Sequence, residues 1–198
     1  SGRVAYRTTF PASLLDRPIG ECTKWWGPDR HIVIYYVTAN REEVYFVTSN
    51  PEPGWTKESW SQTGDLEELR AVFHGFHDEV QAILKACPKV HKWALFERDP
   101  LPRWSQGHVA LLGDACHPMT PYMAQGAASA MEDAIVLSRC IEESSDFETA
   151  FRLYEDLRKP RTSQVQSTSH MNTWMRQRTD PGWVYGYDAW QQPTLSTV

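Results

Sequence analysis

The chain has 198 residues, 41% of them hydrophobic, and a formal net charge of −5, which allows a substantial core in one domain or one and a half. Its 20 basic residues are scattered, which excludes the clustered positive charge of proteins that bind nucleic acid or an anionic membrane. The four cysteines form no C-x-x-C pair, and neither a membrane span of about 20 apolar residues nor a signal peptide is present, so we expect a cytoplasmic protein without a disulfide framework.

The first part of the chain has the pattern of an antiparallel sheet. Residues 1–10 already read as a strand, and residues 31–50 hold two β-branched and aromatic runs around a short polar turn, which predicts a β-hairpin. Side chains alternate across a strand, so Tyr35 and Tyr36 are expected on opposite faces of the sheet. Only one of them can therefore face a pocket.

A helix is predicted over residues 65–86, where apolar residues recur at helical spacing and acidic residues occupy the first turn. His74 and His77 lie three residues apart on it, but no third ligand is close in sequence, and we expect no metal site. Residues 90–98 are predicted to form a further strand, which two prolines end.

The next predicted elements begin with a short apolar run, residues 108–112, that ends in a glycine. This pattern is typical of a buried strand that leads into a loop at the carboxyl edge of a sheet. Helices are predicted over residues 125–141 and 147–159, the second of them stopped or kinked at Pro160. Residues 161–178 are consistent with a resumed helix.

The loop after the apolar run has the residues of a ligand site. Gly113 lets a ligand approach the backbone, and the short carboxylate of Asp114 can accept a hydrogen bond from a sugar-type hydroxyl. Pro118 and Pro121 stiffen the loop. Residues 125–128 open the helix with free N–H groups that suit an anion or a polarised carbonyl, such as the edge of an isoalloxazine ring. Ordinary close packing of a small-residue helix is the alternative.

These residues carry a resemblance to a known family. GDACHP at 113–118, QG at 125–126 and EDA at 132–134 closely resemble the second FAD-binding motif of the single-component flavin-dependent aromatic hydroxylases, the group of the 4-hydroxybenzoate and salicylate hydroxylases. Segments such as KWWGPDRHIVIYY, DPLPRW and WVYGYD look most like one branch, the 6-hydroxynicotinate 3-monooxygenases. The resemblance covers nearly the whole chain.

The resemblance implies an α/β (α+β) fold, with a mixed or antiparallel substrate-binding sheet, the C-terminal part of a Rossmann-type FAD domain, and C-terminal helices. Residues 1–104 would form the substrate-binding sheet region with the helix at 65–86, residues 105–143 the second part of the FAD-binding domain, and residues 144–198 a C-terminal helical region. No G-x-G-x-x-G follows a strand, so the N-terminal dinucleotide-binding half is expected upstream of Ser1, as the missing partner of this half.

The activity that the resemblance implies is hydroxylation of a small aromatic or pyridine carboxylic acid, with FAD, NADH or NADPH, and molecular oxygen. In this family reduced flavin forms a C4a-hydroperoxide, which attacks an electron-rich ring carbon. In the closest branch the carboxylate leaves as carbon dioxide, in a decarboxylative 3-hydroxylation of 6-hydroxynicotinate. A flavin-free binding module is the alternative from another class, because the Rossmann fingerprint is absent.

The family's site residues are carried over position by position. Gly113 and Asp114 match the motif at the FAD ribityl region, where the aspartate makes the contact. The residues that match positions beside the flavin ring are Pro118, Gln125, Gly126 and Ala127. Tyr35 matches a pocket tyrosine that orients the substrate and helps its ionisation, and cross-strand packing is the alternative role for it. His117 is treated by the motif as a loop-shaping residue rather than a general base.

One position of the loop departs from the branch. Where the 6-hydroxynicotinate enzymes have Lys-Pro-His, this chain has Thr120, Pro121 and Tyr122, so a phenol with an ordinary pKa of about 10 replaces an imidazole that titrates near neutral pH. Tyr122 can still donate a hydrogen bond to a carboxylate, and salicylate-type hydroxylases with Pro-Tyr in this loop make that activity the alternative. Tyr35 and Tyr122 are thus the candidate catalytic residues.

Overall fold

The computed structural model describes residues 1–54 and 62–194. The chain divides into two compact units, Ser1–Leu95 (unit 1) and Phe96–Val198 (unit 2). Each unit buries its own clusters of apolar side chains. The mixture of helices with antiparallel sheet confirms the predicted α+β class.

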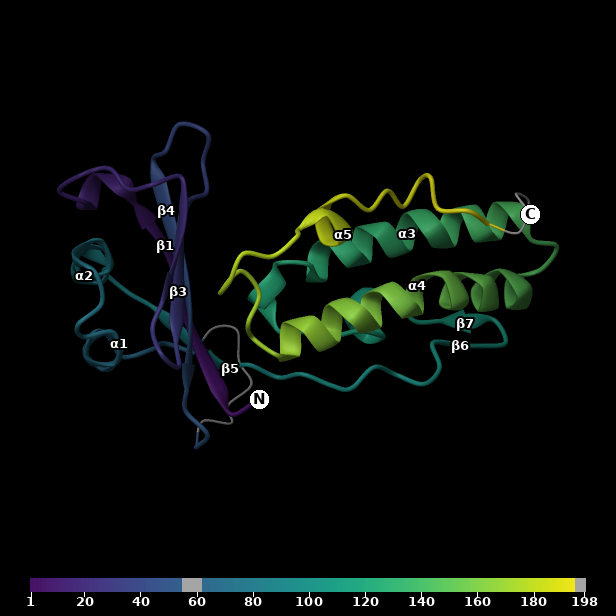
Figure 1. Ribbon diagram of the computed structural model, residues 1–198, viewed down its shortest axis with the longest axis horizontal. Helices are drawn as coiled ribbons and strands as arrows, with labels where there is room; N and C mark the ends of the chain where they lie inside the picture. Colours follow the sequence, from purple (N-terminus) through teal and green to yellow (C-terminus); the bar gives the residue numbers. More distant parts are fainter. Residues whose placement is uncertain (55–61, 195–198) are drawn as a thin grey trace. The chain divides into compact units, whose positions relative to one another are not determined.

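Unit 1 is built on a five-stranded antiparallel sheet in the order β2-β3-β4-β1-β5. Figure 1 labels β1, β3, β4 and β5 of this sheet. Its strands are β1 Arg3–Pro11, β2 Cys22–Trp26, β3 His31–Tyr36, β4 Glu43–Pro51 and β5 His91–Ala94, with a short 3-10 turn, η1, at Ala12–Leu14. The predicted hairpin is confirmed, since β3 pairs with β4 in antiparallel register, with Tyr35 opposite Tyr45. The strand predicted over residues 90–98 is also present, as the shorter β5.

The two faces of this sheet differ, as the alternation of side chains requires. Ile32 and Ile34 are buried, and Tyr36 packs against the same apolar cluster. Tyr35, one residue earlier, belongs to the opposite face, where its ring lies 5.0 Å from that of Tyr45. The two tyrosines therefore point away from each other, as predicted.

The prediction of a single helix over residues 65–86 is wrong in one respect. The segment forms two helices, α1 Leu66–Val72 and α2 Asp78–Ala86. Gly75 lies between them with φ +83°, a left-handed conformation that an α-helix cannot contain and that glycine adopts at little cost. Each helix has its own N-cap, which for α2 is the Nδ1 of His77 accepting the Glu79 N–H at 3.2 Å. The break lets both helices turn apolar side chains into the core of unit 1.

Unit 2 is dominated by two long helices, α3 Gly126–Glu143 and α4 Phe147–His170, which lie side by side (Figure 1). Three residues join them, so they run antiparallel. The smaller elements are the hairpin strands β6 Ser105–Gln106 and β7 Val109–Ala110, the 3-10 turns η2 Gly113–Ala115 and η3 Pro121–Met123, and the short helix α5 Gly182–Tyr185. The helix predicted over residues 125–141 is confirmed as α3.

Two predictions for unit 2 need correction. First, α4 is not stopped at Pro160 but continues through it to His170. A proline in a helix has no N–H to donate to the carbonyl four residues earlier, which here is that of Asp156. Both residues lie on the exposed side of α4, where water can take the place of the missing donor. The helix expected to resume over residues 161–178 is the rest of α4, and it ends at residue 170.

Second, residues 108–112 do not form a buried strand within the described part of the chain. Gly107, with φ +55°, closes a tight turn that pairs the two residues of β7 with β6. Val109 is consequently 66% exposed. The prediction that the apolar run ends in a glycine and a loop is confirmed, because the run leads directly into Gly113 and the turn η2.

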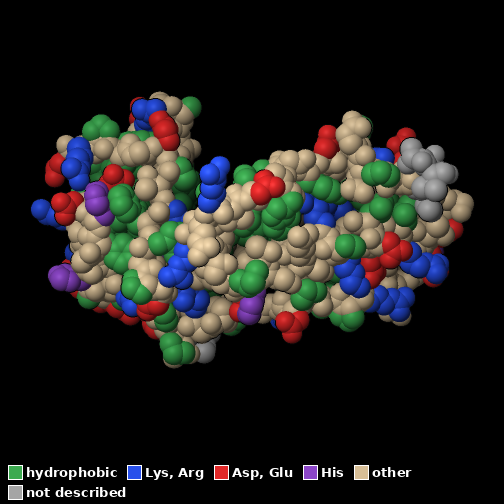
Figure 2. Space-filling view, viewed as in Figure 1, with side chains coloured by type: hydrophobic (Ala, Val, Ile, Leu, Met, Phe, Trp, Pro, Cys, Tyr) green, Lys and Arg blue, Asp and Glu red, His purple; other side chains and the backbone are tan. Residues whose placement is uncertain are grey.

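None of the described helices is both long and apolar enough to cross a bilayer. On the face of the molecule seen in Figure 2, basic and acidic side chains are interspersed in each unit.

Candidate functional site

The glycine of the Gly113–Asp114 pair is required by its surroundings in unit 2. Gly113 has φ +58°, and a Cβ added to it would lie 3.0 Å from the Cβ of Ala130 on α3. For both reasons, any side chain at position 113 would strain the structure. The turn η2 therefore packs closely against α3, which fixes the loop next to the beginning of that helix.

Asp114 is exposed, and its carboxylate lies at the start of α3. Its Oδ1 is 3.9 Å from the position that a Cβ on Gly126 would occupy. Gly113, Asp114 and Gly126, which are predicted site residues from two separate motifs, thus lie together in space. Ala127, the next residue of α3, is exposed beside them.

The first turn of α3 is open to a ligand. It consists of Gly126, Ala127, Ala128 and Ser129, and only the last of these N–H groups bonds within the turn, to the carbonyl of Gln125 at 2.8 Å. Among the described residues, no side chain caps it. Free N–H groups and the helix dipole favour a negative or polarised group here. An acceptor carboxylate, bare N–H donors and small side chains are what a flavin cofactor needs, so the residues present fit FAD.

The loop between η2 and α3 is held by α4. The carbonyl of Pro118 accepts a hydrogen bond from Gln166 Nε2 at 3.0 Å, and the carbonyl of Thr120 accepts one from Ser169 Oγ at 2.6 Å. Tyr122, in η3, is only 7% exposed. Pro118 and Tyr122 therefore belong to a fixed loop, as the two prolines of this segment suggest.

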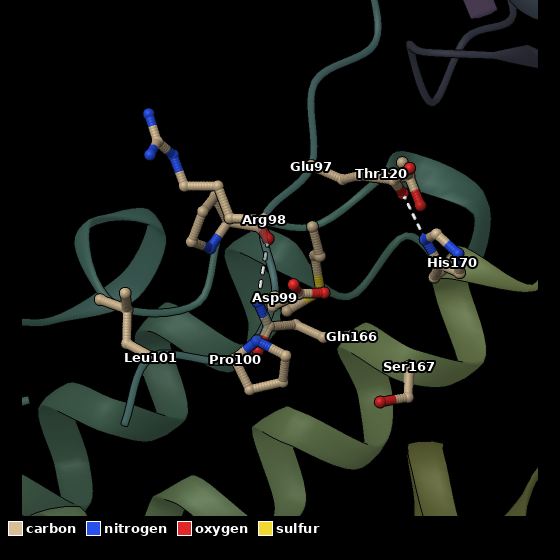
Figure 3. A pocket seen from close by; sticks show the side chains of 11 residues that line it. Glu97, Arg98, Asp99, Pro100, Leu101, Thr120, Gln166, Ser167 and His170 are labelled. Carbon is tan, nitrogen blue, oxygen red and sulfur yellow. Dashed lines mark hydrogen bonds and ion pairs between the residues drawn. The ribbon is translucent and has the colours of Figure 1, made fainter. Parts of the chain in front are cut away.

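A pocket of about 620 Å³ opens beside this loop within unit 2 (Figure 3). The residues that line it come from residues 97–101, from residues 118–120, and from the last turns of α4 at Gln166, Ser167 and His170. His170 Nδ1 lies 2.9 Å from Glu97 Oε2. Of the predicted site residues, only Pro118 lines this pocket, and nothing in the sequence pattern pointed to its other walls.

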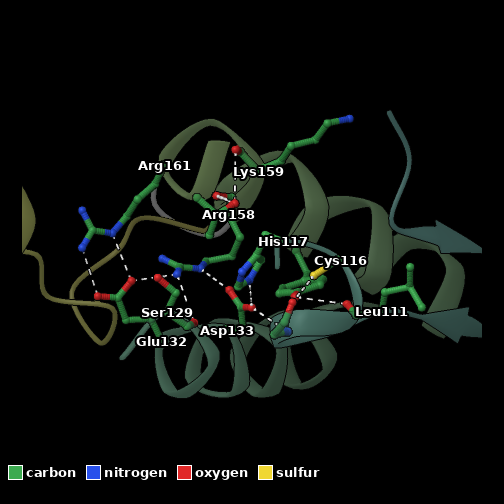
Figure 4. A network of polar contacts seen from close by, with 12 residues as sticks. Leu111, Cys116, His117, Ser129, Glu132, Asp133, Arg158, Lys159 and Arg161 are labelled. Carbon is green, nitrogen blue, oxygen red and sulfur yellow. Dashed lines mark hydrogen bonds and ion pairs between the residues drawn. The ribbon is translucent and has the colours of Figure 1, made fainter. Parts of the chain in front are cut away.

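A buried charge network lies behind the loop and was not predicted from the sequence (Figure 4). Its centre is Asp133 on α3, whose Oδ2 accepts hydrogen bonds from the backbone N–H of Gly113 at 3.1 Å and from Nε2 of His117 at 2.5 Å. Its Oδ1 accepts from Arg158 Nε at 2.7 Å. The side chains of Asp133, His117 and Arg158 are fully buried.

The network continues outward through α4. Arg158 Nη2 binds Glu132 at 2.7 Å, and Arg161 binds both carboxylate oxygens of Glu132 at 3.0 Å. Arg161 also donates to the main-chain carbonyls of Trp183 and Val184 at 2.8 and 2.9 Å. The network thus connects the loop after β7 with the segment that contains α5.

The charges in this network set the protonation state of Asp133. Burial alone would raise the pKa of its carboxyl group, but the hydrogen bonds and charges of His117 and Arg158 outweigh burial and hold the pKa below its usual range. Burial likewise works to lower the pKa of Arg158, and its two carboxylate partners raise the pKa instead. Asp133 and Arg158 are therefore both charged.

Cys116, His117 and Asp133 lie close enough together to suggest a metal site, with ligand atoms within 4.8 Å of one another. Their chemistry does not favour one. The carboxylate of Asp133 already accepts three hydrogen bonds, and burial raises the pKa of the Cys116 thiol to about 12, against the thiolate that a metal requires. The guanidinium of Arg158 already balances the negative charge of Asp133. His117 contacts Asp133 inside the protein and shapes the loop.

Tyr35 lies in unit 1 and Tyr122 in unit 2, and each is fixed within its own unit. Burial, followed by the neighbouring Tyr45 and Cys22, raises the pKa of Tyr35, so its hydroxyl stays protonated near neutral pH. Tyr36 is engaged elsewhere, since its hydroxyl accepts the N–H of Ile19 at 3.1 Å. Tyr45 was missed as a neighbour of Tyr35, although pairing of the two hairpin strands could have placed it.

Comparison with known proteins gives one family and several relatives. The FAD binding domain family matches residues 22–169. The chain is 50% identical to a 6-hydroxynicotinate 3-monooxygenase of Bordetella bronchiseptica and 47% identical to one of Pseudomonas fluorescens, in each case over 98% of this chain and 52% of the relative. It therefore spans about half the length of the curated relatives it matches.

Solved structures show the same fold. A salicylate hydroxylase in complex with its substrate superimposes with a TM-score of 0.77, covering 98% of this chain and 58% of the other, at 24% sequence identity. The chain therefore shares the fold of this hydroxylase.

Proposed function

The chain belongs to the FAD binding domain family, and from this membership we propose that it is part of an FAD-dependent monooxygenase that hydroxylates an aromatic or pyridine carboxylic acid. The reaction proposed is the 3-hydroxylation of 6-hydroxynicotinate, as the names of the relatives suggest. The resemblance to this branch adds that the carboxylate would leave as carbon dioxide. The observation that carries the proposal is the placement of Asp114 against the open first turn of α3, which joins two flavin-binding motifs at one point.

The residues that would hold FAD all belong to unit 2. The carboxylate of Asp114 would accept a hydrogen bond from the ribityl chain. Gly113 is buried against α3 and would fix the loop that carries Asp114, rather than expose its own backbone to the cofactor. Gln125, Gly126 and Ala127 would present N–H groups to the edge of the ring, with Pro118 in the loop beside it. Bound FAD, with NADH or NADPH as reductant, supplies the redox chemistry that activates molecular oxygen.

Two tyrosines are proposed for the substrate. Tyr35, protonated and half-buried, would donate a hydrogen bond that orients the ring and assists its ionisation. Tyr122, held in η3, would donate a hydrogen bond to the carboxylate of the substrate or to a ring oxygen. Salicylate is the second candidate substrate, since Tyr122 supplies a phenol where the 6-hydroxynicotinate branch has an imidazole.

The test uses the full-length protein. We expect a bound-flavin absorbance spectrum, and NADH oxidation that 6-hydroxynicotinate stimulates with formation of a hydroxylated product. Salicylate and a panel of hydroxylated benzoates and pyridine carboxylates serve as comparison substrates, with product measured separately from NADH loss, because flavin monooxygenases also reduce oxygen to peroxide without substrate turnover. A protein without flavin and without substrate-stimulated NADH oxidation would refute the proposal. Faster product formation from salicylate would favour the second candidate.

A further inference from the structure

We propose that Asp133 is a positioning residue, which fixes the loop that carries Asp114 and so places the Asp114 carboxylate for the flavin, and that Arg158 fixes Asp133 in turn. This proposal rests on the proposed flavin function, because it assigns Asp114 to the cofactor. The position of the loop and the binding of the cofactor can, however, be measured separately.

The first argument is where Asp133 makes its contacts. One carboxylate oxygen, Oδ2, accepts from the N–H of Gly113 and from the ring of His117 (Figure 4). These two residues flank Asp114 in the sequence, one immediately before it and one three residues after it. The N–H groups of Cys116 and His117 also bond to the carbonyl of Gly113, at 3.0 Å each. Both ends of the turn are therefore tied to one carboxylate, while Asp114 between them is exposed.

The second argument is that these contacts are strong. A hydrogen bond to a charged acceptor is about twice as strong as a neutral one, and it is stronger still where water is excluded. Asp133 and His117 are both fully buried. A loop held in this way keeps its conformation before the cofactor arrives, so binding does not have to order it.

The third argument is that Arg158 is needed for this arrangement. A charged carboxylate without a partner is costly inside a protein. Arg158 balances the charge of Asp133 and donates a hydrogen bond to its second carboxylate oxygen, Oδ1. Arg158 is itself held by Glu132 and by the carbonyl of Ser129. Its donors bind three groups of α3, so α4 determines the orientation of Asp133.

The experiment compares Asp133→Asn with the wild type in the full-length protein. Asparagine keeps the size of the side chain but loses the charge. Two quantities are measured: hydrogen exchange of the amides of residues 113–117 in the apoprotein, and the dissociation constant for FAD. We expect faster exchange at these amides and an FAD dissociation constant raised about tenfold or more, each factor of ten being about 1.4 kcal/mol.

Asp146→Ala is the matched control for stability. Asp146 caps the first turn of α4 by accepting the N–H of Thr149, away from the loop. Its replacement weakens α4 without touching Asp133, so we expect a lower melting temperature with unchanged FAD affinity and unchanged exchange at residues 113–117. If Asp146→Ala weakens FAD binding as much as Asp133→Asn, a general loss of stability explains the result and the positioning role is overturned.

Arg158→Lys keeps the proposal testable if Asp133→Asn does not fold. Lysine retains the positive charge but lacks the planar fork of N–H donors with which Arg158 binds Asp133, Glu132 and the carbonyl of Ser129, so we expect changes in the same direction and smaller. Wild-type values for both quantities, in either variant that folds, would overturn the proposal. A wild-type protein that binds no FAD would refute the proposed function, and the exchange of the loop amides in Asp133→Asn would still decide the positioning role.

Discussion

The two units bury different kinds of side chain at their centres. The core of unit 1 is an apolar cluster of strand and helix residues, which includes Ile34 and Phe46. Unit 2 has apolar clusters too, but it also encloses the ion pair of Asp133 and Arg158, neither of which has any exposed surface. Unit 1 also buries a charged group, Lys92, yet its carboxylate partners Glu52 and Glu68 remain 28% and 43% exposed. The carboxylates that pair with Lys92 therefore remain in contact with water.

The apolar core of unit 1 and the buried ion pair of unit 2 hold candidate site residues in place in different ways. An apolar core gives a rigid sheet from which Tyr35 projects on the opposite face. A buried network gives a loop whose backbone is held by specific hydrogen bonds, which suits the backbone contacts proposed for a cofactor. We therefore propose that the sheet carries one substrate residue, Tyr35, and that the loop and α3 carry the flavin residues together with Tyr122.

The largest expected effect comes from Arg158→Met, which leaves the Asp133 carboxylate buried without its partner. We expect the free energy of unfolding at pH 7 to fall by about 3–5 kcal/mol. Because the folded-state pKa of Asp133 is lowered, its contribution is present above the unfolded pKa and is lost as the pH falls through the folded pKa. The difference between wild type and variant should therefore persist down to about pH 4 and narrow only below it, as the carboxyl group becomes protonated.

Lys92→Met in unit 1 is the comparison, measured by urea unfolding under the same conditions. Its carboxylate partners can be hydrated after the change, so we expect a loss of about 1 kcal/mol or less. Equal losses in the two variants would remove the distinction between the two charged groups.

Tyr35→Phe tests the role of the sheet. Loss of the hydroxyl should slow ring hydroxylation by about a hundredfold, within the range typical of acid–base groups, with FAD affinity unchanged. Product formation in single turnovers and a flavin titration measure the two quantities. Tyr36→Phe is the control, because Tyr36 faces the core, and its replacement should leave the rate of hydroxylation as it was. Equal turnover of wild type and Tyr35→Phe would assign Tyr35 to packing.

Asp114→Ala tests the role of the loop and should give the opposite result. One charge-assisted hydrogen bond to the flavin is lost, which corresponds to about 1.5–3 kcal/mol, or a dissociation constant for FAD raised about 10- to 100-fold. Fluorescence titration of the apoprotein measures it. Asp156→Ala removes the same charge from the exposed side of α4 and should bind FAD as the wild type does. Unchanged affinity in Asp114→Ala would contradict the assigned contact.

A small effect is also expected for Ile34→Val in the core of unit 1. One buried methylene is removed, so the free energy of unfolding should fall by about 0.5–1.5 kcal/mol. No charged group is involved, so this loss should be the same above and below about pH 4, unlike that of Arg158→Met. A strong pH dependence would mean that titrating groups contribute to this part of the core.

Local patterns in the sequence were sufficient for much of unit 1. The hairpin of β3 and β4 and the opposite directions of Tyr35 and Tyr36 follow from a two-residue period, which depends only on neighbouring residues. The break between α1 and α2 was missed because the apolar spacing continues across Gly75. The left-handed conformation of that glycine outweighs the periodicity, and the residue itself was the available signal.

The network of unit 2 could not be predicted in the same way. Asp133 was recognised as part of a motif, but its partner Arg158 is 25 residues away on another helix, and no spacing rule connects them. The sequence left open whether the helix stops or kinks at Pro160 and whether it resumes beyond it. The stop was wrong, because packing of a long helix against α3 overrides the loss of one hydrogen bond. Motif residues can thus be read from the sequence, whereas the side chains that hold them in place depend on tertiary contacts.

The contacts of Arg161 with the carbonyls of Trp183 and Val184 have an evolutionary consequence. Every residue type has the same main-chain carbonyl. These two hydrogen bonds therefore depend on the path of the backbone at positions 183 and 184 and not on the side chains there. Substitutions at positions 183 and 184 would leave both acceptors in place, so the constraint on these side chains comes from packing, since Val184 is buried in an apolar cluster against which Trp183 packs. Insertions or deletions between α4 and α5 would disturb it more than substitutions do.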